Sequence, residues 1–165
     1  MRYVLDNDLH IHSFLSKCSN DPEQTTERLL QYALDNNLKT ICLTDHYWDR
    51  EVSGAHDWYR EQDFNYICQS KPLPQADGIR FLFGCEADLS KDLEITIPKD
   101  KFNEFDFILI STTHFQLKGV TVYEEDVETI EKTAQTWIKR LDAVLNMAVT
   151  VGSRYGIRSS VRIIF

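Results

Sequence analysis

The chain has 165 residues, of which 42% are hydrophobic and 27% are charged, and its formal net charge is −8. This length and composition are typical of a single globular domain, and the acidic surface argues against nucleic acid as a partner because phosphates repel it. No apolar run approaches the roughly 18 residues of a membrane span, and the N-terminus lacks the apolar core of a signal peptide. We therefore expect a cytoplasmic protein with no membrane partner.

The first two predicted elements are a strand over residues 2–12 and a helix over residues 21–37. Asp21 is the expected N-cap of this helix, with Pro22 in its first turn and Gln24 as its capping-box partner. The apolar residues at helical spacing, which predict the buried face, are Leu30, Ala33, Leu34 and Leu38.

Three further apolar runs predict buried strands, over residues 39–46, 79–88 and 106–114. The segments between them are predicted as a loop entering a helix (47–67), a short strand (92–98) and a short helix or turn (99–105). Apolar strands that alternate with helices indicate an α/β fold, in which parallel strands are covered by outer helices.

The last part of the chain predicts a long helix over residues 124–147. Its expected buried stripe consists of Val127, Ile130, Ala134, Trp137, Ile138 and Leu141. From Ala143 onward there are three arginines and no acids, and the chain ends on the apolar run VRIIF. We interpret residues 1–145 as the domain and residues 146–165 as an atypical or truncated segment. The alternative is that the final run is a last strand closing a small sheet.

The chain contains four cysteines, Cys18, Cys42, Cys68 and Cys85. Because none forms a C-x-x-C pair and we expect a reducing compartment, they predict free thiols. Cys42 and Cys85 lie inside apolar runs, so both are expected to be buried.

Histidines and acids gather at the ends of the predicted strands. Four of the five histidines, His10, His12, His46 and His114, lie at strand ends, and the remaining apolar strand ends with Glu86 and Asp88. The carboxyl ends of parallel strands share one face of the sheet, where ligands bind. Residues two apart on a strand point the same way, so the two imidazoles of an H-x-H pair can converge on one ion. This arrangement predicts a metal site.

Other polar residues have more than one interpretation. Asp8 and Asp45 each precede a histidine closely and are expected to orient a ring without binding the ion. Cys18 is either a thiolate ligand or a small buried thiol. His56 is either an exposed loop histidine or a substrate contact above the same site.

Four motifs in this order, each after a predicted strand, resemble those of the PHP family, the polymerase and histidinol phosphatase domain. The motifs are DLHIH (8–12), LTDH (43–46), GCEAD (84–88) and STTH (111–114). The resemblance covers about the first 145 residues. It implies a distorted seven-stranded β/α barrel whose mouth holds two or three divalent ions (zinc, manganese or iron) and which hydrolyses phosphoesters.

The resemblance also implies roles for individual residues. His10, His12 and Glu86 would hold one ion, Glu86 would bridge to a second ion with His114, and His46 would bind a third. Cys18 stands where many relatives supply a further histidine. The family has two later motifs that contain histidine, whereas no histidine follows His114 here. We therefore expect an incomplete (β/α)7 barrel and a C-terminally incomplete member of the family.

The expected function is that of a metal-dependent phosphoesterase. It would hydrolyse a small phosphorylated metabolite, in the manner of a histidinol phosphatase, by means of a metal-bound hydroxide. Two alternatives remain: a catalytically incomplete fragment that binds metal, and a metal hydrolase of the amidohydrolase type. An incomplete barrel also leaves strand edges open, which predicts a homo-oligomer.

Overall fold

The computed structural model describes residues 5–19, 21–59 and 61–154. Its centre is a five-stranded sheet. The strands are β1 (Asn7–Ile11), β2 (Thr40–Leu43), β3 (His46–Tyr47), β4 (Arg80–Asp88) and β5 (Phe107–Ser111). Every pairing between them is parallel, as β1 with β2, β2 and β3 with β4, and β4 with β5.

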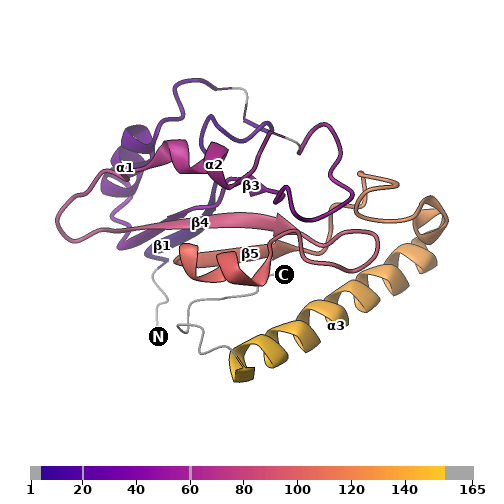
Figure 1. The fold of residues 1–165 in the computed structure, drawn as a ribbon. Coiled ribbons are helices and arrows are strands. Elements are labelled where there is room, and N and C mark those ends of the chain that lie inside the picture. Colours follow the sequence, from indigo (N-terminus) through magenta and orange to yellow (C-terminus); the bar gives the residue numbers. More distant parts are fainter. Residues whose placement is uncertain (1–4, 20, 60, 155–165) are drawn as a thin grey trace.

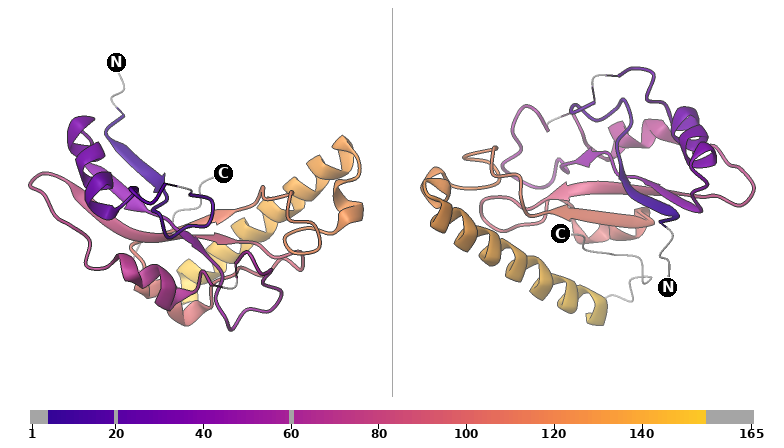
Figure 2. Two further views of the ribbon diagram at one scale, coloured as in Figure 1. Left: turned by 90° about the horizontal axis from the view of Figure 1, so that it is seen from above. Right: turned by 180° about the vertical axis from the view of Figure 1, so that it is seen from behind.

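The sheet is curled into a half-barrel with helices around it, which confirms the predicted fold class (Figures 1 and 2). The helices are α1 (Thr26–Asp35), α2 (Phe64–Ile67) and α3 (Ile130–Arg154). Short 3₁₀ turns cover Cys68–Ser70, Lys99–Glu104 and Glu124–Val127. None of the helices in the described part of the chain combines the length and apolar character that a membrane crossing requires.

Strand β4 is the longest and organises the sheet. Its first half pairs with β2 and its second half with β3 and β5. Gly84 lies where these strands are closest, because a Cβ there would come within 2.6 Å of the Phe107 carbonyl oxygen and 2.8 Å of the Cys42 sulfur. Any larger residue would therefore push β4 away from its neighbours.

Cys42 and Cys85 are buried as expected.

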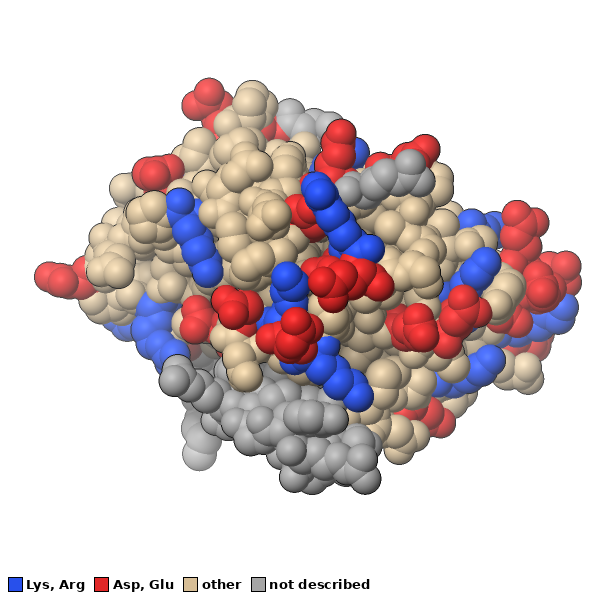
Figure 3. Space-filling model, viewed as in Figure 1, with Lys and Arg blue, Asp and Glu red and all other residues tan. Residues whose placement is uncertain are grey.

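Among the described residues, the core consists of three clusters of buried residues. One cluster packs against the 3₁₀ turns and includes Phe83, Cys85, Phe102, Phe105 and Ile108. A second lies under α1 and includes Ile11, Leu29, Ala33, Ile41 and Leu43. The third consists of Cys42, Phe107 and Leu109. On the face drawn in Figure 3, acidic and basic side chains are interspersed.

The predicted start of the first helix is wrong. Helix α1 begins at Thr26, and the side chain of Thr25 accepts the capping hydrogen bond from the Arg28 N–H. Asp21 instead accepts from the backbone N–H of Glu23 in a tight turn, and the Gln24 side-chain amide donates to the carbonyl oxygen of His12 at 2.5 Å. The residues before α1 therefore hold the end of β1 and do not extend the helix.

The predicted buried face of this helix is only partly right. Leu30 and Ala33 are buried, but Leu34 is 43% exposed and Leu29 takes its place in the core. The short strand expected over residues 92–98 is also wrong, since this segment contributes only an isolated antiparallel bridge between Leu89 and Ile95.

The largest correction concerns the expected buried stripe of α3, most of which faces outward. Only Leu141 and Val127, which precedes the helix, are half-buried. Ile130 is 85% exposed, Ile138 58% and Trp137 42%, whereas Arg140 and Val144 are buried. The helix runs along the outside of the molecule (Figure 1). The face that it turns inward is the one that hydrogen-bonds the carbonyl groups of two loops.

Arg140 explains this orientation. Its Nε donates to the Thr112 carbonyl oxygen at 2.9 Å and its Nη2 to that of Leu89 at 2.8 Å. Its Nη1 donates to the carbonyl oxygens of Ser90 and Thr121. A guanidinium has five N–H donors in a fixed plane, so one side chain satisfies four buried carbonyl groups.

Helix α3 continues through residue 145 to Arg154. The division of the chain into residues 1–145 and 146–165 stays a prediction. The closing strand considered for VRIIF, residues 161–165, lies outside the described residues.

Candidate metal centre

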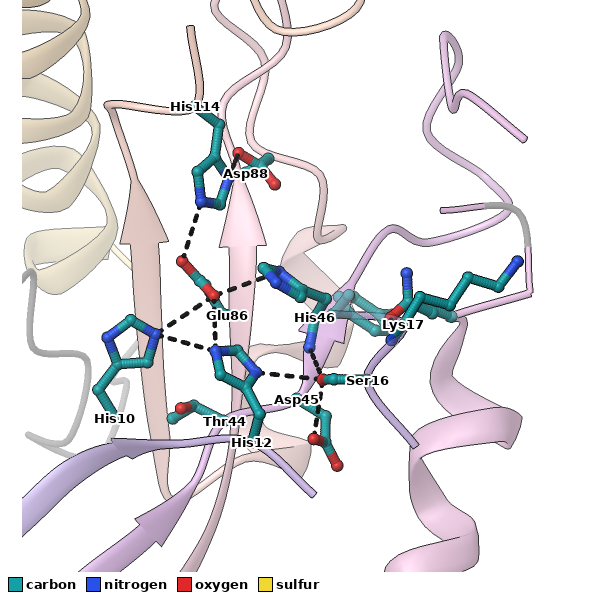
Figure 4. A network of polar contacts seen from close by, with 12 residues as sticks. His10, His12, Ser16, Lys17, Thr44, Asp45, His46, Glu86, Asp88 and His114 are labelled. Atoms are coloured by element: carbon teal, nitrogen blue, oxygen red, sulfur yellow. Dashed lines mark hydrogen bonds and ion pairs between the residues drawn. The ribbon is translucent and has the colours of Figure 1, made fainter. Parts of the chain in front are cut away.

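The carboxyl ends of the strands bring the predicted site residues together (Figure 4). His10 lies on β1, and His12 directly follows that strand. His46 begins β3, Glu86 lies near the end of β4, and His114 follows β5. Parallel pairing places these ends at one edge of the sheet, so side chains that are up to 104 positions apart (114 − 10) meet there.

The carboxylate of Glu86 is the centre of this cluster, and it is 3% exposed. Its Oε2 lies 3.3 Å from Nε2 of His10 and 3.3 Å from Nε2 of His12. The same oxygen lies 3.2 Å from Nδ1 of His46, and Oε1 lies 3.6 Å from Nε2 of His114. Four imidazoles therefore surround one buried carboxylate.

These distances between ligand atoms fit the tetrahedral coordination of one metal ion. Two ligand atoms that are each about 2.0 Å from one zinc ion, at the tetrahedral angle, lie about 3.3 Å apart. The donor atoms of His10, His12 and Glu86 all lie within 4.8 Å of one another, and so do those of His12, Cys18 and His46. Imidazole nitrogen, carboxylate oxygen and thiolate sulfur are also the ligands that such ions prefer.

His46 gives an independent indication that a cation belongs here. Burial lowers the pKa of His46 to about 3, so its imidazole is neutral. Its Nδ1 is buried and makes no hydrogen bond among the described residues, although it lies 3.2 Å from Glu86. An unpaired buried nitrogen close to a carboxylate is unfavourable, and a positive ion between the two would satisfy both. The residues present therefore fit a divalent ion.

Hydrogen bonds around Glu86 keep the carboxylate charged. Burial by itself raises the pKa of Glu86, but the contacts with the surrounding imidazoles, the hydrogen bond with His10 first among them, outweigh it, so the pKa lies below its usual range. The hydrogen bond to Glu86 in turn raises the pKa of His10. In the absence of a metal ion, the surrounding rings therefore stabilise the negative charge of the Glu86 carboxylate.

Cys18 is exposed, so the interpretation as a small buried thiol is wrong. Partial burial is the largest cause of the rise in its pKa, which keeps the thiol protonated in the absence of a cation. A metal ion would reverse this, because coordination deprotonates a thiol. Its role as a ligand stays a prediction.

The two aspartates expected to orient rings do so less directly than the sequence suggests. Asp8 accepts from the backbone N–H of His10 at 3.3 Å and from the Tyr32 hydroxyl at 3.4 Å, so its hydrogen bond with His10 is to the backbone. Asp45 accepts from Ser13 and Ser16. Its connection to an imidazole passes through Ser16.

Asp88, which the sequence places at a strand end without a predicted role, orients one of the rings. Its Oδ1 lies 2.8 Å from Nδ1 of His114, and its Oδ2 accepts from the Tyr59 hydroxyl. Burial lowers the pKa of His114, but the hydrogen bond to Asp88 outweighs it and the pKa is raised. The spacing in the sequence could have indicated this role, because Asp88 follows Glu86 by two positions on a strand and so points to the same side.

A pocket of about 540 Å³ adjoins the cluster. It is lined by Cys18, His46, His56, Trp58, Tyr59, His114, Gln116 and Leu117. His56 is exposed and lines this pocket, where its Nδ1 accepts the backbone N–H of Trp58 at 3.2 Å. A neutral His56 therefore carries its proton on Nε2. The described lining residues include no lysine or arginine.

Comparisons with known proteins match this chain to a family. The family model described as the PHP domain matches residues 8–159. A protein of Caldicellulosiruptor saccharolyticus described as a probable phosphatase is 26% identical over 108 residues. The matched region is 65% of this chain and 41% of that relative, so the chain spans about two fifths of the relative's length.

Proposed function

Because this chain belongs to the PHP domain family, as its four motifs predicted, we propose that it is a metal-dependent phosphoesterase. The observation that carries the proposal is the set of four imidazoles around Glu86 at separations suited to shared metal ligands. The relative described as a probable phosphatase supports the same reaction class. The substrate we propose is a small phosphomonoester, with histidinol phosphate as the first compound to test.

The residues divide into overlapping ligand sets. His10, His12 and Glu86 would hold one ion, and Glu86 with His114 would hold a second. His46 and Cys18 would bind a third. When bound, such divalent ions polarise the phosphoryl oxygens and lower the pKa of water.

The other side chains of the site would orient the metal ligands and bind the substrate. Asp88 retains the proton of His114 on Nδ1, which leaves Nε2 directed toward Glu86. The adjoining pocket would take the organic part of the phosphomonoester against Trp58 and Leu117. Because no described lining residue is cationic, the phosphoryl group would be held at the metal end of the pocket.

The direct test is phosphate release by the purified chain supplied with zinc, manganese or iron. We expect hydrolysis of histidinol phosphate or another small phosphomonoester, and loss of activity when a chelator is added. A cyclic amide serves as the comparison substrate, since hydrolysis of the amide alone would favour an amidohydrolase-type enzyme and contradict the proposal.

A second candidate is a domain that binds metal without turnover. It is favoured by one observation, that the described residues lining the adjoining pocket include no lysine or arginine to hold a phosphoryl group. Calorimetric titration with zinc separates the two cases. Tight binding with no phosphate release from any phosphomonoester would support this candidate over the enzyme.

Metal affinity should depend on pH. Because hydrogen bonds to carboxylates raise the pKa values of His10 and His114 above about 6.5, both rings must lose a proton before they bind a cation. We expect zinc affinity to fall about tenfold to 100-fold per pH unit as the pH drops below these raised values. Calorimetry between about pH 6 and pH 8 would measure this slope, and a constant affinity would contradict it.

His56 should affect substrate binding more than turnover. Replacing it by alanine removes the Nε2 donor from the pocket, and the loss of one hydrogen bond predicts a rise in KM of about twofold to tenfold with little change in kcat. A His56→Gln variant keeps a donor and should retain a KM near that of the wild type. An unchanged KM in both variants would identify His56 as an ordinary exposed loop histidine.

A further inference from the structure

The hydroxyl group of Ser16 joins three segments of the metal centre. It is 1% exposed and lies 2.9 Å from Oδ1 of Asp45 and 3.1 Å from Nδ1 of His12. It also accepts the backbone N–H of His46 at 3.0 Å. Ser16 thus contacts the backbone of one predicted ligand and the ring of another, and both contacts are visible in Figure 4.

Counting protons fixes the direction of these bonds. A serine hydroxyl has one hydrogen and two acceptor positions, and the N–H of His46 occupies one acceptor position. The single hydrogen must go to Asp45, to His12 or to the sulfur of Cys18, which also contacts the Ser16 side chain. A carboxylate is the strongest acceptor of the three because the hydrogen bond is charge-assisted. Ser16 therefore donates to Asp45 and accepts from Nδ1–H of His12.

This direction determines the tautomer of His12. With its proton on Nδ1, the neutral ring has a bare Nε2, the atom that lies 3.3 Å from Oε2 of Glu86. If Ser16 donated to His12 instead, the proton would move to Nε2 and block the ligand position. The Ser16 hydroxyl thus connects the carboxylate of Asp45 to the ring of His12, although Asp45 and His12 do not bond each other directly.

We infer that Ser16 is a positioning residue that relays the charge of Asp45 to His12 and holds His12 in its metal-binding tautomer. The inference rests on the proposed metal centre and deepens it. His114 reaches the same state through a direct bond to Asp88. Asp45 accepts from the N–H and hydroxyl of Ser13, at 2.6 and 2.7 Å, and reaches His12 only through Ser16 among the described contacts.

The test is the proton position on His12 in metal-free protein, read by long-range ¹H–¹⁵N correlation NMR at about pH 8, above the ordinary imidazole pKa of about 6.5. In the wild type we expect Nδ1 to be protonated and Nε2 to be bare. In Ser16→Ala the population should shift toward the Nε2–H form, and Ser16→Thr, which keeps a hydroxyl, should restore the wild-type spectrum. A purely structural role would leave the tautomer unchanged.

Zinc titration provides the second readout. Loss of a group that orients a ligand typically costs 10-fold to 100-fold in metal affinity, and we expect this loss in Ser16→Ala. Ser13→Ala is the matched control, since its hydroxyl bonds Asp45 without a recorded contact to His12, and it should leave the tautomer unchanged. A wild-type His12 protonated on Nε2 would overturn the inference even if Ser16→Ala failed to fold. An absence of phosphatase activity would refute the proposed function and leave this result standing.

Discussion

Replacing Glu86 by glutamine is expected to lower the affinity of the chain for zinc by more than about 100-fold. Loss of a group that merely orients a ligand costs up to about 100-fold, and Glu86 is itself the oxygen donor that all four imidazoles approach. An amide of the same shape keeps the volume and removes the negative charge. Calorimetric titration with zinc measures the change.

The control for this variant is Glu104→Gln, the same substitution at an exposed position in a 3₁₀ turn. It should bind zinc as the wild type does. Unaltered zinc affinity in Glu86→Gln would place the metal elsewhere and remove the basis of the proposed function.

The same variant has a readout that needs no metal. The hydrogen bond to Glu86 is the largest cause of the raised pKa of His10. In Glu86→Gln the pKa of His10 should therefore fall toward its ordinary value of about 6.5. An NMR titration of His10 follows this shift, and a pKa that stays raised would show that another group holds its proton.

Replacing Arg140 by methionine is expected to reduce the free energy of unfolding by about 3–5 kcal/mol. Each buried polar group left without a partner costs about 1–3 kcal/mol, and Arg140 satisfies four carbonyl groups in the wild type. Methionine fills much of the same space and donates no hydrogen bond. Urea denaturation of the metal-free protein measures the loss.

Lys139→Met is the matched control, because Lys139 is an exposed neighbour on the same helix and should change stability by less than about 0.5 kcal/mol. The carbonyl groups that Arg140 binds belong to segments that follow β4 and β5. These segments adjoin Asp88 and His114, so Arg140→Met should also weaken zinc binding. A loss of stability below about 1 kcal/mol would mean that solvent or another donor replaces the guanidinium.

Helix α3 shows why a pattern of apolar residues does not decide which face of a helix is buried. Ile130, Trp137 and Ile138 have ideal helical spacing, yet the helix turns Arg140 inward. Burial needs a partner surface of matching shape and polarity, and here that surface is a set of loop carbonyl groups. A sequence read alone gives no signal that an arginine will meet them.

The start of α1 has a similar explanation. Asp21, Pro22 and Gln24 match the usual pattern of a helix start, but Gln24 bonds the backbone of His12 and Thr25 caps the helix. A contact to β1 therefore outweighed the local preference. The identity of the metal ions, the substrate, the cytoplasmic location and the homo-oligomer stay predictions.

The sequence by itself determined the family and the parallel sheet, and it predicted that four histidines and Glu86 would meet at one edge. This was possible because each motif follows an apolar run, and parallel pairing places all such strand ends on the same side. Only the tertiary structure decided that Asp88 serves His114, that Asp45 reaches His12 through Ser16, and that Arg140 faces inward. These features depend on contacts between segments that are far apart in the sequence. The spacing of residues along the chain does not give the distances or the hydrogen-bond directions of such contacts.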